Sequence, residues 1–173
     1  MSLDNMEPII NWKEIKTVLF DMDGTLLDLY FDYYFWQEYL PEQWAKKNNM
    51  STQEAKVKLL DWYEKESGTL SWYCLDFWTQ KLNFDVFALK ADVRHLIKYR
   101  PHAESFLKRL HQLDFSLTLV TNAHEKLIRM KTEETGIDTF FGEIISSHSI
   151  GHAKEENAFW EKLKSKVPFD ENK

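Results

Sequence analysis

The stretch that most constrains this chain runs from Lys16 to Leu27 and reads KTVLFDMDGTLL. Its residues 17–20 are β-branched or apolar, which predicts one short buried strand. Asp21 and Asp23 follow at once, and Gly24 lets the chain turn where a Cβ would obstruct it. Because ligands bind outside the carboxyl ends of strands in open α/β sheets, we expect the chemistry of the chain to lie here.

Asp21 and Asp23 are two residues apart, so their side chains share a face of an extended chain. Two carboxylates held this close repel each other when both are ionised, and a divalent cation relieves that repulsion. Mg²⁺ prefers such hard oxygen ligands together with a substrate phosphate. The alternative interpretation is an acidic turn without chemistry, since Asp and Gly are ordinary turn residues.

The composition is that of a globular chain without a basic surface. Of the 173 residues, 43% are hydrophobic and 29% are charged, which is enough to bury a core. The net charge of −6 argues against nucleic acid and membranes as partners, and no apolar run approaches the roughly 20 residues of a membrane span.

The single cysteine, Cys74, rules out an internal disulfide and is interpreted as a small core residue. The N-terminus lacks a signal-peptide pattern, so we expect a cytoplasmic protein.

Residues 29–99 have helical periodicity. Aromatic and leucine residues recur at helical spacing from residue 31 to residue 40, where Pro41 interrupts the pattern. Ser51 and Glu54 predict a capping box at the start of a second helix. A third helix is expected from about residue 71 and a weaker fourth over 86–97. The buried face of the second helix is predicted to consist of Ala55, Leu59, Trp62 and Tyr63. Four amphipathic helices inserted directly after the acidic loop can lie over the crevice as a lid.

From Pro101 onward, helices and strands alternate. Pro101 suits the first turn of a helix, whose buried face would be Phe106, Leu107 and Leu110. Residues 115–120, FSLTLV, predict a second strand, and a helix over 123–135 would be closed by Gly136. A third strand is expected over 143–147 and a last helix from about 154 to 164. This order predicts an α/β fold with a core formed by 1–28 and 100–173 and a helical cap over 29–99.

Thr121 and Asn122 end the second predicted strand as Asp21 ends the first. A hydroxyl and the backbone N–H groups at a helix start can bind phosphate oxygens. The alternative is that Thr121 only caps the helix that begins near His124. His124 and His152 are also expected near this crevice, with a surface or packing role favoured over substrate contact. The other histidines, including His148, lack metal-ligand spacing in the sequence.

Lys154 lies a short loop beyond the third predicted strand, in GHAKEENAFW. A lysine at this place can neutralise a nucleophile and a phosphate, as cationic groups do in phosphoryl-transfer sites. The alternative is a solvated lysine paired with nearby glutamates.

These features together resemble the haloacid dehalogenase-like (HAD) phosphatases. DxDGT after the first strand, Thr121-Asn122 and Lys154 look like three of the four family motifs, in order. The resemblance implies a Rossmann-like parallel-sheet core with an inserted α-helical cap. More narrowly, DMDGTLLDLYFDYYFWQEYLPEQW and SWYCLDFW look like the bacterial GMP/IMP 5′-nucleotidase branch.

The resemblance also implies roles for these residues. Asp21 would attack phosphorus and form an aspartyl-phosphate, and Asp23 would protonate the leaving oxygen and then activate water. Mg²⁺ would be held by the Asp21 carboxylate and the Asp23 backbone carbonyl. Thr121, Asn122 and Lys154 would bind the phosphoryl group of a small phosphorylated metabolite.

One family feature is missing from the sequence. The fourth motif is an acidic pair after a fourth strand, whereas Asp170 and Glu171 stand in a polar tail with no apolar run before them. We therefore expect a shortened core in which the first strand lies at the sheet edge, open to self-association. Two functions stay open: a Mg²⁺-dependent phosphomonoesterase, or a non-catalytic protein that binds phosphate ligands or partners.

Overall fold

The computed structural model describes residues 12, 14–113, 115–167 and 169. Residues 1–11 and the tail acids Asp170 and Glu171 lie outside these residues. Three parallel strands form the sheet in the described part of the chain: β1 (Thr17–Phe20), β2 (Ser116–Thr121) and β3 (Glu143–Ser146), in the order β1-β2-β3. The α/β fold and the three predicted strands are confirmed, with ends that differ by about one residue.

The register brings the ends of β1 and β2 together. Phe20 pairs with Leu119, and Thr121 pairs with Ser146 on the other side. Parallel strands end on the same edge, so the residues that follow β1 and β2 emerge beside each other. As expected, β1 is an edge strand of the described sheet.

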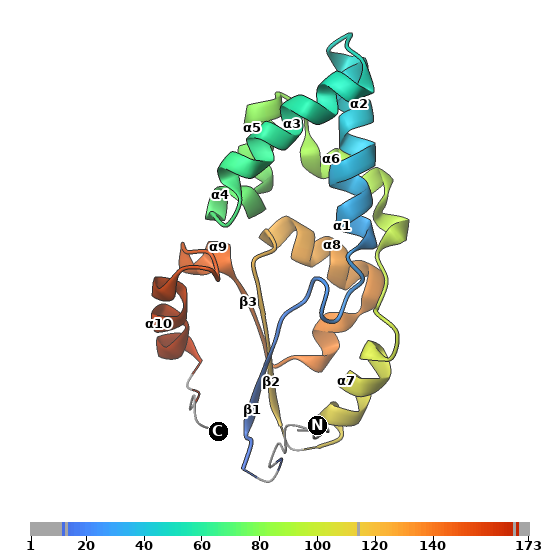
Figure 1. Ribbon diagram of the computed structural model, residues 1–173. Helices are drawn as coiled ribbons and strands as arrows, with labels where there is room; N and C mark the ends of the chain where they lie inside the picture. Colours follow the sequence, from blue (N-terminus) through green and yellow to red (C-terminus); the bar gives the residue numbers. More distant parts are fainter. Residues whose placement is uncertain (1–11, 13, 114, 168, 170–173) are drawn as a thin grey trace, which may run out of the picture.

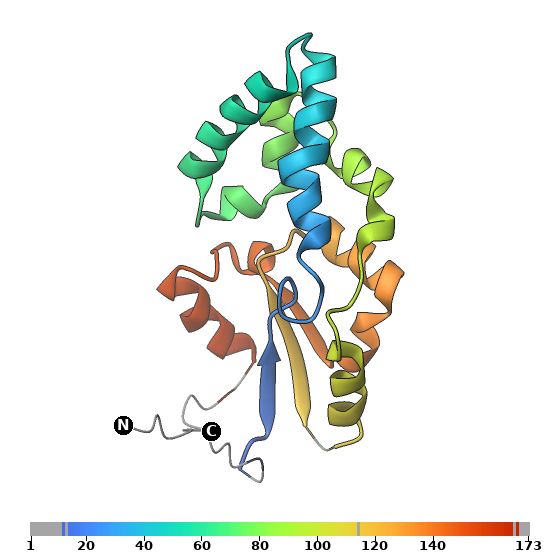
Figure 2. The same ribbon diagram turned by 45° about the vertical axis from the view of Figure 1, so that its right-hand side comes forward.

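Helices cover both faces of the sheet. On one side lie α7 (Ala103–His111) and α8 (Glu125–Thr135), and on the other lies α10 (Asn157–Lys166), as Figures 1 and 2 show. Successive side chains of β2 point to the two sides of the sheet in turn, because neighbours on a strand point to opposite faces. Leu119 joins the larger apolar cluster, and Val120 joins a smaller one with Ile145 and Phe159. The result is a three-layer arrangement.

Several predicted boundaries in this region are corrected. Pro101 precedes α7 instead of starting it, since His102 has a φ of 68° and the helix begins at Ala103. Phe106 is 42% exposed, so the buried face of α7 is Ala103, Leu107 and Leu110. The last helix begins at Asn157, three residues later than expected. Gly136 does close α8, with a φ of 65°. Two short elements, η3 (Ile137–Phe140) and α9 (Ser147–Ile150), flank β3.

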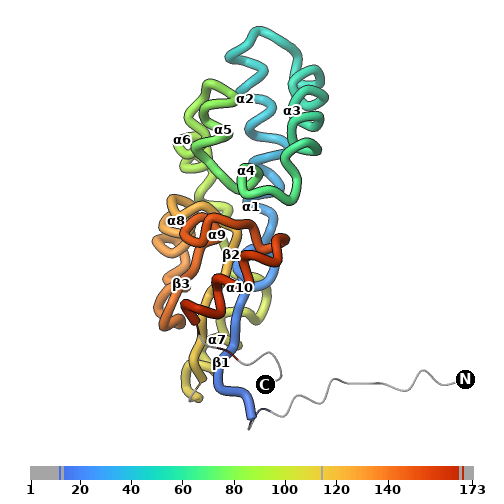
Figure 3. Tube along the Cα trace, turned by 90° about the vertical axis from the view of Figure 1, so that its left-hand side faces the viewer, coloured from blue at the N-terminus to red at the C-terminus, as the bar shows by residue number. Residues whose placement is uncertain are grey.

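Residues 30–96, here called the helical insertion, sit above the carboxyl ends of the strands (Figures 1 and 3). Its first rod is continuous through α1 (Tyr30–Tyr34), η1 (Phe35–Tyr39) and α2 (Leu40–Lys47). The expected interruption at Pro41 is wrong, because this proline stands in the first turn of α2, directly after a π-helical segment, where its missing N–H does little harm.

Of the three other predicted helices of the insertion, one is present as a single helix and two are divided. The helix α3 (Thr52–Glu66) has the predicted capping box between Ser51 and Glu54. The third predicted helix is split by an extended residue at Cys74 into α4 (Leu70–Tyr73) and α5 (Leu75–Leu82). The fourth divides into α6 (Val86–Asp92) and η2 (Arg94–Leu96).

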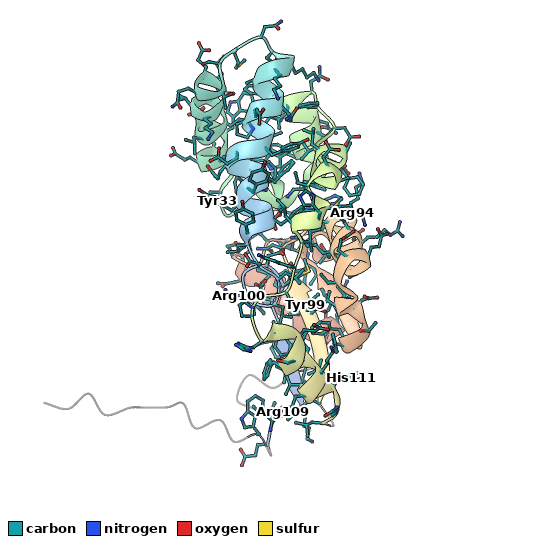
Figure 4. All side chains as sticks on the ribbon, turned by 90° about the vertical axis from the view of Figure 1, so that its right-hand side faces the viewer. Tyr33, Arg94, Tyr99, Arg100, Arg109 and His111 are labelled. Atoms are coloured by element: carbon teal, nitrogen blue, oxygen red, sulfur yellow. The ribbon has the colours of Figure 1, made fainter. Side chains whose placement is uncertain are left out.

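Two adjacent chain segments connect the insertion to the sheet. Leu27 forms an antiparallel bridge with Tyr99, and the Arg100 N–H donates to the Leu26 carbonyl at 2.9 Å. Figure 4 shows Tyr99 and Arg100 at this junction. One apolar cluster runs through the insertion and the sheet, and the boundaries at 28/29 and 99/100 stay a prediction.

Candidate active site

Asp21 and Lys154, far apart in the sequence, meet at the end of β1. Lys154 Nζ lies 2.7 Å from Asp21 Oδ1 and 3.1 Å from the carbonyl oxygen of Val120. The Thr25 hydroxyl donates to the other carboxylate oxygen of Asp21 at 3.0 Å. The Asp21 side chain remains 37% exposed, so a ligand can reach it.

The acidic loop is held in a tight turn by its own backbone. The N–H groups of Leu26 and Leu27 both donate to the Met22 carbonyl, at 2.9 and 2.8 Å. Met22 is fully buried and anchors the loop. Gly24 has a φ of 84°, and a Cβ there would meet the Leu29 side chain at 3.0 Å, so glycine is needed at this turn.

Asp23 belongs to a buried chain of charges. Lys131 Nζ, from α8, lies 2.6 Å from Asp23 Oδ1 and 2.7 Å from Asp32 Oδ2, and Lys90 Nζ lies 2.7 Å from Asp32 Oδ1. Lys131 and Lys90 are 2% and 0% exposed. Asp32 and Lys90 come from α1 and α6 of the insertion, so this network joins the insertion to the acidic loop.

The network sets the proton affinity of its members. Burial raises the pKa of Asp23 above its ordinary value, while Lys131 acts in the opposite direction. Burial alone would also raise the pKa of Asp32, but Lys131 and Lys90 together hold it well below the ordinary value. The two carboxylates outweigh the burial of Lys131 and raise the pKa of that ammonium group. Asp32 and Lys131 are therefore ionised at neutral pH, and of the two carboxyl groups Asp23 has the greater tendency to hold a proton.

Sequence reasoning did not find Lys90, Lys131 or Asp32. The available signal was positional: Lys131 falls four residues after Leu127 on the core-facing side of α8. A lysine in such a row has to find a buried partner.

Thr121 and Asn122 lie beside Asp21, as predicted, but they make different contacts from those considered. The Thr121 hydroxyl accepts from the Ala123 N–H at 3.0 Å, and His124 instead caps α8. Asn122 Oδ1 accepts from the Lys154 N–H at 2.9 Å, which fixes the backbone that carries Lys154. Asn122 Nδ2 donates to both carboxylate oxygens of Glu155, at 3.0 and 3.3 Å.

Glu155 also receives a contact from the insertion. The Tyr73 hydroxyl, from α4, donates to Glu155 Oε1 at 2.6 Å. Burial, reinforced by this bond, raises the pKa of Tyr73 to about 12. Tyr73 and Glu155 were not singled out in the sequence, and together they make a second polar link between the insertion and the sheet.

These groups line a cavity of about 660 Å³ between the insertion and the sheet, a volume typical of small-molecule sites. Asp21, Asp23, Thr121, Asn122 and Lys154 all contribute to its wall. Neither His124 nor His152 occurs among the described residues that line it, in keeping with the favoured surface or packing role. The aromatic part of the wall consists of Tyr33, Trp36, Trp72, Tyr73 and Trp160.

The oxygen atoms at the end of β1 suit a hard cation. Mg²⁺ usually takes one or two protein carboxylates and completes its shell with water and substrate phosphate. The Asp21 carboxylate, which lines the cavity and is partly exposed, is a ligand of this kind. The other acids on the cavity wall in the described part of the chain, Asp23, Asp32 and Glu155, are already bonded to lysines or to Asn122 and Tyr73.

Comparison with known proteins shows the family of the chain. A sequence model of the haloacid dehalogenase-like hydrolases matches residues 15–170. The chain belongs to this family. GMP/IMP nucleotidase YrfG of Escherichia coli (strain K12) is 40% identical over 151 residues, which cover 87% of this chain and 68% of the relative. Phosphoglycolate phosphatase of Vibrio cholerae is 29% identical, covering 83% of this chain and 67% of that protein.

Solved structures of HAD proteins share the fold. The HAD phosphatase from Thermococcus onnurineus superposes with a TM-score of 0.72 at 23% identity, over 86% of this chain and 72% of that one. HAD-hydrolase YfnB from Bacillus subtilis, solved bound to magnesium, gives a TM-score of 0.59 at 20% identity, over 89% and 74%. The predicted family, fold class and assignment as an enzyme are therefore confirmed. Within the described residues, no helix is long and apolar enough to cross a membrane.

Proposed function

We propose that this HAD hydrolase is a Mg²⁺-dependent phosphomonoesterase that works through an aspartyl-phosphate on Asp21. The observation that carries the proposal is the placement of the Asp21 carboxylate, which faces a ligand-sized cavity with the Lys154 ammonium 2.7 Å away. A carboxylate nucleophile beside a fixed cation can accept a phosphoryl group whose oxygens the cation then stabilises. Bound Mg²⁺ would supply further positive charge to those oxygens.

The reaction proceeds in two displacements. A carboxylate oxygen of Asp21 bonds to phosphorus as the ester P–O bond breaks, and the leaving oxygen takes a proton from Asp23. Asp23, now ionised, accepts a proton from a water molecule whose oxygen attacks the same phosphorus. The bond between phosphorus and Asp21 breaks, inorganic phosphate leaves, and Asp23 has regained its proton.

The surroundings of Asp23 support both roles. Burial raises its pKa, which favours the protonated form that the first step requires. Lys131 pulls in the other direction and stabilises the carboxylate that the second step requires. A group balanced between two opposing influences can act as acid and base in turn.

We propose a purine nucleoside 5′-monophosphate such as GMP or IMP as the substrate. The 40% identical relative carries the name GMP/IMP nucleotidase. The cavity is large enough for a nucleotide and presents Trp36 and Trp72, which stack on each other at 5.9 Å with an interplanar angle of 26°. Aromatic faces of this kind bind nucleobases by stacking. Two further aromatic residues of the insertion, Phe31 and Trp78, are buried in the core.

The proposal is tested by phosphate release from GMP, IMP, phosphoglycolate and ribose 5-phosphate, with Mg²⁺ or with EDTA. We expect Mg²⁺-dependent release that is fastest with GMP or IMP. Fastest release from phosphoglycolate would overturn the substrate assignment. Nucleotide binding by calorimetry without any release would favour the alternative function, a non-catalytic protein that binds phosphate ligands.

A further inference from the structure

Cys74, His124 and His148 come together outside the catalytic cavity. One ligand atom from each residue lies within 4.8 Å of those of the other two. Cys74 belongs to the insertion, between α4 and α5, whereas His124 caps α8 and His148 lies in α9. Figures 1 and 3 show α4 of the insertion directly above α9. The sequence spacing of these residues gave no hint of this group, because it is assembled by the docking of the insertion on the sheet layer.

His148 has unused binding capacity. Its Nε2 atom is buried and has no hydrogen-bond partner among the described residues, whereas buried polar atoms are normally bonded. The rings of His148 and His124 are 4.8 Å apart. Burial lowers the pKa of His148 to about 4 and that of His124 below its usual value. Both rings are therefore neutral at pH 7, the form that ligates metals.

The rest of the surroundings is compatible with a cation. The carboxylate of Asp76 lies 3.7 Å from His124 Nε2, and Lys126 Nζ lies 2.5 Å from its other oxygen. The Cys74 sulfur accepts one hydrogen bond, from the Phe77 N–H at 3.4 Å, which caps α5. His124 Nδ1 accepts a hydrogen bond from the Lys126 N–H, which places the ring proton on Nε2. A cation bound to Nε2 would move that proton to Nδ1, and this one hydrogen bond would be lost in exchange for the bond to the cation.

We propose that Cys74, His124 and His148 form a binding site for a thiophilic divalent cation such as Zn²⁺, which fastens the helical insertion to the sheet layer. One sulfur and two imidazole nitrogens suit Zn²⁺ or Co²⁺ and not Mg²⁺. Tetrahedral Zn²⁺ with bonds of about 2.0–2.3 Å holds its ligand atoms roughly 3.3–3.8 Å apart. Side-chain rotations that move the ligand atoms by about 1 Å would therefore complete the site. Three protein ligands leave the fourth position to water or to Asp76, which makes the ion exchangeable.

The cation would act on the cavity through the neighbours of Cys74. Tyr73, which is bonded to Glu155, and Leu75 both line the catalytic cavity. Fixing Cys74 to α8 and α9 would hold this part of the wall against the sheet and slow the exchange of ligands. This consequence rests on the proposed phosphatase function, but the metal site itself does not.

The first test uses Co²⁺ as a spectroscopic probe on the full 173-residue chain. We expect one equivalent of Co²⁺ to give a thiolate-to-cobalt charge-transfer band, because Cys74 is the only thiol. The band should vanish in Cys74→Ser, and Co²⁺ affinity should fall at least tenfold in His148→Gln. His95→Ala removes an exposed histidine from η2 and should leave the band unchanged. Absence of the band in the unaltered chain, or its survival in Cys74→Ser, would overturn the proposal.

A second test needs no substitution. Zn²⁺ should slow alkylation of Cys74 by iodoacetamide at least tenfold, whereas the same concentration of Mg²⁺ should not. Equal protection by both ions, or by neither, would contradict the site. Neither readout depends on catalysis, so failure of the phosphatase proposal would leave these results interpretable.

Discussion

Lys131 and Asp23 form a 2.6 Å ion pair that ties the middle of α8 to the acidic loop. Lys131 also binds Asp32, which in turn binds Lys90. Asp23, the proposed acid–base group, is therefore connected through Lys131, Asp32 and Lys90 to α1 and α6 of the insertion. A movement of the insertion would change the partners of Lys131 and, with them, the proton affinity of Asp23.

Lys131→Met should move the pH dependence of phosphate release upward. Burial raises the pKa of Asp23 and Lys131 opposes this, so removal of the lysine lets Asp23 keep its proton to a higher pH. Both limbs of the pH–rate profile that report Asp23 should shift in the alkaline direction. Lys58→Met, on the exposed side of α3, serves as the control. An unchanged profile in Lys131→Met would show that the ion pair does not tune Asp23.

The same substitution should destabilise the fold in a pH-dependent way. Removal of one partner from a buried ion pair costs about 3–5 kcal/mol of the free energy of unfolding. In the variant, protonation of Asp23 relieves part of the loss, so the deficit should be smaller at pH 5 than at pH 8. Urea unfolding of the variant and of the unaltered chain, at pH 5 and at pH 8, measures the loss of unfolding free energy at each pH.

Lys154→Ala should reduce turnover by roughly 10²-fold or more, the scale of losing one electrostatic stabiliser. The reason is its contact with Asp21, where phosphoryl charge would develop. Lys108→Ala, which removes a lysine from the exposed pair with Glu104 on α7, should have no such effect. A small rise in KM alone for Lys154→Ala would mean that the lysine contributes only to binding.

Trp72→Leu should impair nucleotides more than small phosphate esters. Trp72 lines the cavity and stacks on Trp36, and the loss of a stacking face costs about 1–3 kcal/mol per base. We expect kcat/KM to fall by roughly tenfold or more for GMP and much less for ribose 5-phosphate. Trp62→Leu is the control, because Trp62 packs on Trp44 in the insertion. Equal losses for both substrates would assign Trp72 a structural role only.

Within the part of the chain that the structure describes, β1 lies at an edge of the sheet, and this position predicts self-association. An edge strand presents unpaired N–H and C=O groups that can pair with a second copy. Light scattering should show a mass that rises with concentration, and Thr17→Lys should suppress the rise. Val57→Lys, which adds the same charge to an exposed position of α3, should not. A constant monomer mass would show that this edge is closed to pairing.

Sequence reasoning reached the sheet and much of the cavity wall because these depend on local patterns. Residues 17–20 are apolar and Asp21 follows them, so both the strand and its acidic end could be predicted. The network of Lys131, Asp32 and Lys90 could not, because each lysine is locally an ordinary helix residue. Lys131 becomes buried where α8 meets the insertion, and Lys90 becomes buried where α6 packs on the aromatic rings of the first rod. The break at Cys74 escaped for a related reason, since the helical periodicity continues across it.

The most direct measurement of the central claim is phosphate release from GMP with Mg²⁺ by the unaltered chain and by Asp21→Asn, with folding of both checked by circular dichroism. The account predicts release by the unaltered chain and a loss of roughly 10⁴-fold or more in the variant, the scale of removing a nucleophile. Release by Asp21→Asn within tenfold of the unaltered chain, or no release by the unaltered chain at all, would contradict it.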